Sequence, residues 1–558
     1  MFYDGKVLLG KTDGGEDLYI YPKMANRHGL IAGATGTGKT VTLKVMAESF
    51  SDAGVPVFLA DAKGDLAGMC RVGENSEDMT KRMEFFGLAE KGFDFTKYPV
   101  NFWDVYGERG IQLRTTISEM GPLLLSRIMG LNDTQADILN IVFKIADENS
   151  LLLVDTKDLK SMLQYVAENA KEFSLQYGNL PVNSINVIIR AVVALESDGG
   201  DKFFAEPALN IKDWLKTDDD GKGFIQILEC EKLMLNPKTY SMFLLWMLSE
   251  LYETLPEAGD LAKPKMVFFF DEAHMLFDQA PQVLLDKIEQ VVKLIRSKGV
   301  GIYFITQNPR DIPDGVLSQL GTKVQHALHA YTPNEQKAMK AAADGFRVNP
   351  KFDTLTVLGE LGTGEALVSV MGEDGVPTIV ERTKILPPMS KMGSIDDSTL
   401  NSAINASALF DKYNDYVDPD SAYERLTKMK ADEEEAEAKA KEEAAAQKAK
   451  EKAEKEAQKA KEKEELAAQK AAQKEAEKAE REAQKAAEKA EKEAQKAKEA
   501  KGKTVKKAAK NVASSTAGTI GRELGKAVGG SVGGSFGKTL GGNVGASLFR
   551  NIIGTFIK

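Results

Sequence analysis

Short runs of apolar residues recur over the segment 1–390, separated by longer stretches whose apolar positions have helical spacing. Each run is short for a helix, and uninterrupted apolar runs of this length are typical of strands buried on both faces. Strands that alternate with helices predict an α/β fold with a parallel, doubly wound central sheet. The runs lie at 30–32, 55–60, 223–230, 265–270 and 300–306, and shorter ones at 323–328, 365–370 and 378–381 can complete the sheet.

The segment 113–215 interrupts this alternation and predicts a helical insertion between sheet strands. Apolar-rich stretches lie at 123–131 and 138–146, and Asn132 followed by Asp133 is a helix-start signal. Residues 1–27 are expected to form a short strand pair or arm ahead of an ATPase domain at 28–390. Residues 391–430 are interpreted as a connector.

Residues 33–40 fit the phosphate-loop pattern G-x-x-x-x-G-K-[ST] at every fixed position. Its glycines allow a tight turn that brings backbone N–H groups against phosphate oxygens, and the helix predicted at 41–50 points its N-terminus at them. Lys39 is expected to contact the β- and γ-phosphates of ATP, and Thr40 to bind Mg²⁺. The predicted nucleotide-binding residues are Gly33, Ala34, Thr35, Gly36, Thr37, Gly38, Lys39 and Thr40.

A pair of acids follows the apolar run that ends at residue 270. Asp271 is predicted to hold the water shell of Mg²⁺, and Glu272 to orient and deprotonate the attacking water. His274 is interpreted as a structural residue or a γ-phosphate relay rather than a metal ligand. Together with the phosphate loop, this motif predicts an ATP hydrolase.

Polar residues also follow two further predicted strands, at the carboxyl ends where ligands of parallel sheets bind. Gln307 follows the run 300–306 and is predicted to sense the γ-phosphate, the alternative being an amide that only caps the strand. Asp61 and Lys63 follow the run 55–60. They are candidate site residues or members of a surface turn.

Charge is distributed unevenly: residues 1–430 have a net charge of −16, and residues 431–558 one of +6. The acidic front part argues against general coating of nucleic acid but leaves room for a local basic channel. Cys70 and Cys230 are too few for a disulfide framework. With no signal peptide and no apolar run long enough to span a membrane, a cytoplasmic location is expected.

Three segments carry a family resemblance: HGLIAGATGTGKT at 28–40, FFFDEAH at 268–274 and RSKGVGIYFITQNP at 296–309. They resemble the HerA-like ATPases of the HerA–FtsK superfamily, most closely the bacterial helicase HerA-like subgroup. LNDTQ at 131–135 and FFAEP at 203–207 extend the resemblance over about 20–390. It implies a RecA-like P-loop fold, ATP hydrolysis with Mg²⁺, a hexameric ring and translocation on duplex DNA.

Ring motors of this kind also place an arginine in the neighbouring subunit's site. The candidates are Arg114, Arg296, Arg310 and Arg382, of which Arg296 and Arg382 are preferred. Better-known members carry a β-barrel before the ATPase core, which the segment 1–27 is too short to build. The alternatives to a DNA motor are an ATPase that remodels or secretes protein, and a nucleotide-gated scaffold.

Residues 431–510 consist almost entirely of Ala, Glu, Lys and Gln, which are strong helix formers. The triplet Ala-Gln-Lys starts at positions 446, 457, 468, 472, 483 and 494, and its commonest spacing is close to the period of a straight helix. Large apolar residues are almost absent, so a tight coiled coil lacks its seam. A solvated single helix of roughly 120 Å is predicted, with a partly disordered linker as the alternative.

Residues 511–558 form a glycine-rich tail with glycine at every fourth position from 521 to 545. On a helix these glycines make one smooth stripe suited to close packing, although each costs about 1 kcal/mol relative to alanine. The tail is therefore expected to be disordered alone or to pack against another copy, a protein partner or a membrane surface.

Overall fold

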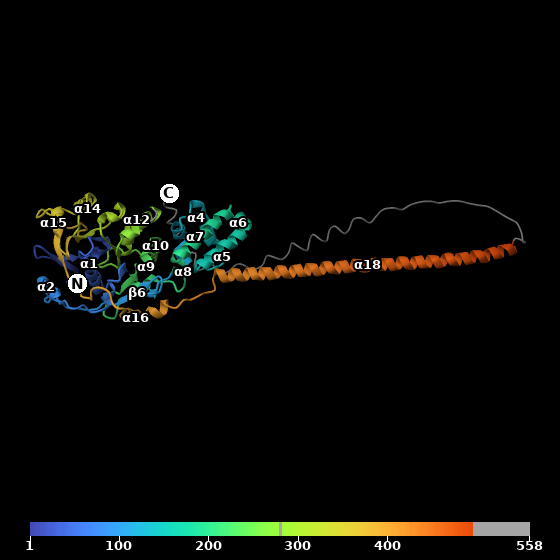
Figure 1. Cartoon of the computed structure of the whole chain (residues 1–558), viewed down its shortest axis with the longest axis horizontal. Helices are drawn as coiled ribbons and strands as arrows, with labels where there is room; N and C mark the ends of the chain where they lie inside the picture. Colours follow the sequence, from blue (N-terminus) through green and yellow to red (C-terminus); the bar gives the residue numbers. More distant parts are fainter. Residues whose placement is uncertain (278–281, 495–558) are drawn as a thin grey trace. The chain divides into compact units, whose positions relative to one another are not determined.

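A single sheet forms the core of the compact unit at 1–427 in a computed structural model that describes residues 1–277 and 282–494 (Figure 1). Within these residues the sheet has 13 strands. Eight neighbouring strands run parallel, as the apolar runs predicted. In spatial order they are β11 (Thr322–His326), β4 (Gly29–Ala32), β10 (Val300–Thr306), β9 (Met266–Phe270), β5 (Val57–Asp61), β8 (Ile225–Glu229), β6 (Val100–Asp104) and β7 (Ile111–Gln112).

The strand order decides which carboxyl ends meet. β10 lies between β4, which leads into the phosphate loop, and β9, which leads into the acidic pair. Its register aligns Thr306 with Ala32 of β4 and Phe304 with Phe270 of β9. The phosphate loop, Gln307 and Asp271 therefore follow three adjacent strands at the same edge of the sheet.

Helices cover the two faces of the parallel strands, which explains why β9 and β10 are buried along their whole length. The crossover from β4 to β5 contains α1 (Lys39–Asp52) and runs in one direction along the sheet. The crossovers into β9 and β10 contain α10 (Pro237–Thr254) and α12 (Gln282–Ile295) and run in the opposite direction. Because such crossovers are right-handed, α1 lies on one face, and α10 and α12 on the other.

The predicted helical insertion is present, and Figure 1 shows its helices α4 to α7 grouped together. Asn132 caps α4 through a capping box with Gln135, as the helix-start signal predicted. The insertion comprises α3 (Ile117–Ile128), α4 (Asp133–Glu148), α5 (Thr156–Glu168), α6 (Ala170–Tyr177) and α7 (Val182–Leu195). The remaining helices are α2 (Glu77–Phe86), α8 (Asp201–Phe203), α9 (Glu231–Met234), α11 (His274–Phe277), α13 (Asp314–Leu317), α14 (Pro333–Asp344), α15 (Thr354–Glu360), α16 (Asp397–Asn405) and α17 (Phe410–Tyr413).

The segment 1–27 forms paired strands, one of the two predicted alternatives, and they belong to the sheet rather than to a separate arm. It forms β1 (Phe2–Tyr3), β2 (Lys6–Thr12) and β3 (Asp17–Ile20). β2 pairs antiparallel with β13 (Glu381–Ile385), which continues through β12 (Glu365–Ser369) to β11. Burial of the apolar residues at 7–9 against the core accounts for this docking, which depends on a strand from the far end of the ATPase domain.

The long helix α18 (Ala422–Ala494) begins ahead of the predicted position 431. Its first turn is tied to the insertion, because Asp158 accepts hydrogen bonds from the Ser421 hydroxyl (2.6 Å) and the Tyr423 backbone (2.8 Å). Residues 1–427 form one compact unit, and the helix from Lys428 onward belongs to another. The residues at 428–475 are exposed throughout, as a solvated single helix requires.

No single helix of the described residues has the length and apolar character needed to span a membrane. One sharply bent pair of helices, α6 with 182–203, has the required length and composition only when its two parts are taken together. The predictions for the glycine-rich tail at 511–558 lie outside the described residues.

Candidate nucleotide site

The phosphate loop has the backbone conformation that its glycines predicted. Gly33, Gly36 and Gly38 have φ values of 155°, 78° and 115°, a region that residues with a side chain rarely adopt. Space is also limited, because a Cβ on Gly33 would lie 2.5 Å from the Cβ of His326. A Cβ on Gly36 would meet nothing within 4 Å, so this part of the loop is open to a ligand.

Lys39 lies at the N-terminus of α1, with its ammonium group turned back over the loop. Its Nζ donates to the carbonyl oxygens of Gly33 (2.6 Å) and Ala34 (3.1 Å). Burial lowers the pKa of Lys39, while the nearby carboxylates Glu272 and Asp271 act in the opposite direction. Lys39 and the acidic pair therefore share one electrostatic environment, although they lie far apart in the sequence.

His326, at the end of β11, supports the loop from behind. Its Nε2 lies 2.8 Å from the Thr42 hydroxyl of α1, and its Nδ1 lies 2.9 Å from the Glu365 carbonyl oxygen. Since that carbonyl can only accept, Nδ1 carries the proton and Nε2 accepts from Thr42. Burial lowers the pKa of His326 to about 4, which keeps the ring neutral. Sequence reasoning missed His326, and the only signal was that one of just four histidines in the chain lies within a predicted strand, at 323–328.

Asp271 and Glu272 follow β9 at the same edge, and each is only 7% exposed. Burial raises the pKa of Asp271 to about 6, and the adjacent Glu272 adds to this rise. Glu272 has a φ of 45°, the left-handed region that is uncommon for a residue with a side chain. Strained backbone of this kind concentrates at functional sites, where the surrounding structure holds it in place.

Lys63 reaches this acidic pair from the turn after β5. Its Nζ lies 2.5 Å from Oε1 of Glu272. Burial alone would raise the pKa of Glu272, but the hydrogen bond and charge of Lys63 outweigh burial and lower it. His274 Nδ1 lies 3.4 Å from Oε2 of the same carboxylate. The sequence left open whether Lys63 is a site residue or a member of a surface turn. In the structure, Lys63 contacts the site through Glu272.

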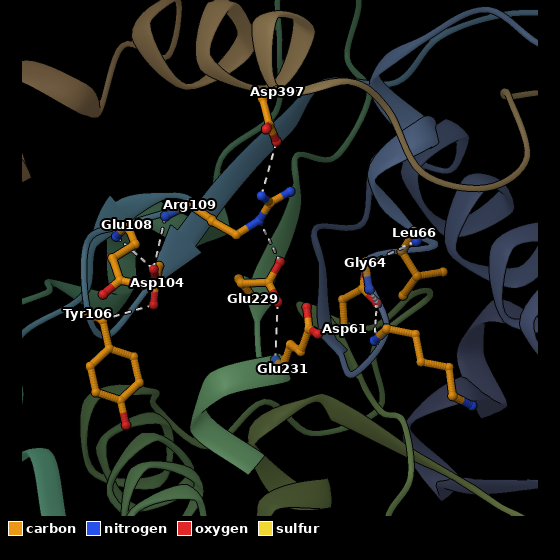
Figure 2. A network of polar contacts seen from close by, with 11 residues as sticks. Asp61, Gly64, Leu66, Asp104, Tyr106, Glu108, Arg109, Glu229, Glu231 and Asp397 are labelled. Atoms are coloured by element: carbon orange, nitrogen blue, oxygen red, sulfur yellow. Dashed lines mark hydrogen bonds and ion pairs between the residues drawn. The ribbon is translucent and has the colours of Figure 1, made fainter. Parts of the chain in front are cut away.

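Asp61, in contrast, is used locally. Its carboxylate accepts N–H bonds from Lys63 (3.1 Å), Gly64 (2.8 Å) and Leu66 (3.0 Å) and so closes the turn after β5. Figure 2 shows that acidic residues at the ends of β6 and β8 also accept hydrogen bonds from nearby loop backbone. Asp104 at the end of β6 binds three backbone N–H groups, and Arg109 bridges Glu229 and Asp397. These carboxylates bind groups of the loops at the sheet edge. Asp61 affects the site only indirectly, because it accepts a hydrogen bond from the backbone N–H of Lys63.

The other predicted residues lie in different settings. Gln307 is exposed at the end of β10, next to the phosphate loop, as its proposed sensor role needs. Arg382 in β13 forms an ion pair with Glu365 (2.7 Å). Arg296 is exposed and precedes β10, at the sheet edge opposite the phosphate loop. For Gln307 and both arginines, the catalytic roles remain predictions.

The two other arginine candidates differ from each other in burial. Arg114 is 3% exposed, and its guanidinium donates to the Tyr413 carbonyl oxygen (2.8 Å), so it has a structural role. Arg310 is exposed shortly after Gln307.

The residues present fit ATP and Mg²⁺. The loop offers backbone N–H groups at the start of α1, together with one ammonium group. Asp271 supplies a buried carboxylate, and Thr40 a half-buried hydroxyl, which are hard oxygen ligands of the type Mg²⁺ prefers. Among the described residues no cluster of three His, Cys, Asp or Glu side chains forms a protein-only metal cage. One or two protein ligands, completed by phosphate and water, is the usual arrangement for Mg²⁺.

The fold and this site define a P-loop nucleoside triphosphatase with a RecA-like parallel sheet. The family described as "Helicase HerA-like C-terminal" matches residues 6–465, and the chain belongs to this family. Membership supports an ATP-hydrolysing P-loop enzyme and confirms the resemblance in the three motif segments.

Two curated proteins are similar to the chain. The DNA double-strand break repair helicase HerA of Sulfurisphaera tokodaii is 22% identical over 386 residues, which cover 66% of this chain and 67% of that protein. The probable helicase MJECL08 of Methanocaldococcus jannaschii is 31% identical over 125 residues, 22% of each chain.

The chain also aligns with solved structures at low sequence identity. The conjugative coupling protein TrwBdeltaN70 aligns with a TM-score of 0.46 and 13% identity over 70% of this chain and 90% of that one. VirB4 of Thermoanaerobacter pseudethanolicus aligns with a TM-score of 0.42 and 17% identity over 69% and 97%.

Proposed function

We propose that this protein is a Mg²⁺-dependent ATPase that assembles as a homo-oligomeric, hexameric ring in the cytoplasm and translocates on or unwinds duplex DNA. The observation that carries the hydrolysis step is the convergence of Lys39 and Glu272 from strands on either side of β10. A helix N-terminus with a lysine binds triphosphate, and a buried carboxylate beside it deprotonates water.

The chain's own residues divide the work of hydrolysis. Lys39 and the loop N–H groups bind and orient the phosphates. Asp271 and Thr40 would hold Mg²⁺, which neutralises charge on the phosphate oxygens. Glu272 takes the proton from the attacking water, and Gln307 contacts the terminal phosphate. An arginine from a neighbouring subunit would stabilise the charge that develops during transfer.

DNA as substrate is supported by family membership and by the similarity to the repair helicase of Sulfurisphaera tokodaii. The net charge of −16 over residues 1–430 favours the second candidate, an ATPase that moves a protein substrate. In either case the tail at 511–558 is proposed to mediate self-association or attachment to a protein or membrane surface.

Steady-state ATP hydrolysis, measured with and without duplex DNA over a dilution series, tests the proposal. A DNA ring motor should be stimulated by DNA and lose specific activity on dilution. Glu272→Gln serves as the control, because it should bind ATP but not hydrolyse it. Hydrolysis that is indifferent to DNA, together with DNA affinity that does not fall with salt, would reject DNA as the substrate in favour of protein.

A further inference from the structure

Lys63 and Glu272 are joined across two adjacent parallel strands. β5 and β9 pair in register up to Ala60 and Phe270, so the residues that follow them are neighbours at the sheet edge. The Lys63 ammonium lies 2.5 Å from Oε1 of Glu272, within the range of a charge-assisted hydrogen bond. The backbone of Lys63 is itself fixed, because its N–H donates to the buried Asp61 carboxylate.

The two oxygens of Glu272 have different surroundings. Oε1 is bound by Lys63, whereas Oε2 is buried and has no hydrogen-bond partner among the described residues. His274 Nδ1 is near Oε2, but at 3.4 Å the pair does not have hydrogen-bond geometry. A buried carboxylate oxygen without a partner is costly and is satisfied when a water donates to it.

The backbone of Glu272 lies in the left-handed region next to Asp271. Glu272 has a φ of 45°, and its own N–H donates to Oδ1 of Asp271 (2.9 Å). Backbone in this region persists only where the surrounding structure holds it in place. Lys63 makes the shortest side-chain contact to the Glu272 carboxylate, at 2.5 Å, and comes from the turn after β5.

We propose that Lys63 is a positioning residue for Glu272: it holds Oε1 so that Oε2 faces the attacking water. This proposal rests on ATP hydrolysis as the proposed function and deepens it. Lys63 does not replace Lys39, whose ammonium is on the phosphate loop. The side chain of Lys63 is half exposed (51%), so a ligand bound over this turn could reach it and alter the orientation of the base.

The experiment compares Lys63→Met, Lys63→Arg and a matched control, Lys216→Met, in the full chain. Lys216 forms a similar ion pair with Asp213 (2.7 Å), with side chains 59% and 10% exposed against 51% and 9% for Lys63 and Glu272. Lys63→Met should lower kcat roughly tenfold or more, since general-base catalysis contributes about 10²–10⁴-fold. The Kd of a fluorescent ATP analogue should stay within about twofold, Lys63→Arg should restore part of kcat, and Lys216→Met should match the parent.

A double variant separates action through Glu272 from other effects. In a Glu272→Gln background, Lys63→Met should cause no further loss of the residual single-turnover rate. A further loss there, an unchanged kcat in Lys63→Met, or parallel losses of kcat and ATP affinity would each overturn the proposal. If Lys63→Met does not fold, Lys63→Gln keeps most of the side-chain volume and gives the same readouts.

The same measurements distinguish failure of the proposed ATPase function from failure of the proposed role of Lys63. Absence of hydrolysis by the parent protein, or full activity in Glu272→Gln, would reject hydrolysis or the assignment of the base. Hydrolysis that depends on Glu272 but not on Lys63 would reject only the role of Lys63.

Discussion

The Thr42 hydroxyl donates to Nε2 of His326 across 2.8 Å, joining the start of the phosphate-loop helix to the end of β11. The two residues are 284 positions apart, and the bond is buried. The opposite ring nitrogen donates to Glu365, so the neutral ring connects α1 to the start of β12. The geometry of the phosphate loop therefore depends on strands outside the nucleotide motifs.

The buried, neutral ring of His326 predicts that the free energy of unfolding depends on pH. Burial lowers the pKa of His326 from 6.5 to about 4, so the folded state binds this proton less readily than the unfolded state. The stabilisation is fully present above pH 6.5 and is lost as the pH falls toward 4, by about 2 kcal/mol between pH 7 and pH 5. His28, whose pKa burial also lowers to about 4, adds a similar loss.

Urea unfolding of the parent and His326→Gln at pH 7 and pH 5 measures this contribution. His28 and all carboxylates are common to both proteins, so the difference between them isolates His326. The variant should be less stable at pH 7 and should lose about 2 kcal/mol less on acidification. Equal losses in the two proteins would show that His326 does not titrate as its burial requires.

Gly33→Ala should weaken nucleotide binding while leaving the chain folded. The added Cβ would lie 2.5 Å from His326 Cβ and 2.9 Å from Thr37 Oγ1, at a φ of 155°. The loop must shift to relieve these contacts, so the Kd for ATP should rise at least tenfold, about 1.4 kcal/mol. Gly87→Ala is the control, because Gly87 also has a positive φ (63°) but nothing within 4 Å of its Cβ position. It should cost about 1 kcal/mol of stability and leave the Kd unchanged.

Of the two preferred arginines, we expect Arg296 rather than Arg382 to act in a neighbouring subunit. Arg382 is held by Glu365, whereas Arg296 is exposed. Arg296→Ala should lower kcat by about 10³-fold or more and leave ATP affinity intact. Mixing it with Lys39→Ala subunits should restore activity, because those subunits supply the arginine to an intact site. No recovery on mixing, or a larger loss in Arg382→Ala, would contradict the assignment.

The isolated segment 428–494 should be helical and monomeric. Its described ion pairs, Glu435 with Lys439 (2.6 Å) and Glu437 with Lys441 (3.0 Å), have i,i+4 spacing and exposed side chains. Such pairs contribute about 0.3–0.5 kcal/mol each and weaken with salt. Far-ultraviolet dichroism should show helix that decreases at high salt, and sedimentation a monomer. A spectrum without helical minima would establish the linker alternative, and a dimer would establish a coiled coil.

The sequence by itself determined the parts of this protein that are local. Gly33 to Thr40 needs no partner to be identified, because the spacing of glycine, lysine and threonine defines a loop that binds phosphate. The apolar run before Asp271 identifies a buried strand, since apolar residues on both faces exclude a surface position. The helical propensity of Ala, Glu, Lys and Gln predicted α18, whose residues at 428–475 are all exposed.

Only the tertiary structure decided the relationships between distant residues. Strand order placed β10 between β4 and β9, and brought Lys63, in the turn after β5, onto Glu272. The position of His326 next to Gly33 and the pairing of β2 with β13 cannot be identified from a local sequence pattern. Each depends on which strands pair. Asp61 and Lys63 looked equivalent in sequence, yet Asp61 closes a turn and Lys63 contacts Glu272. Hydrogen bonds between strands select the neighbours, and that selection is a property of the whole folded chain.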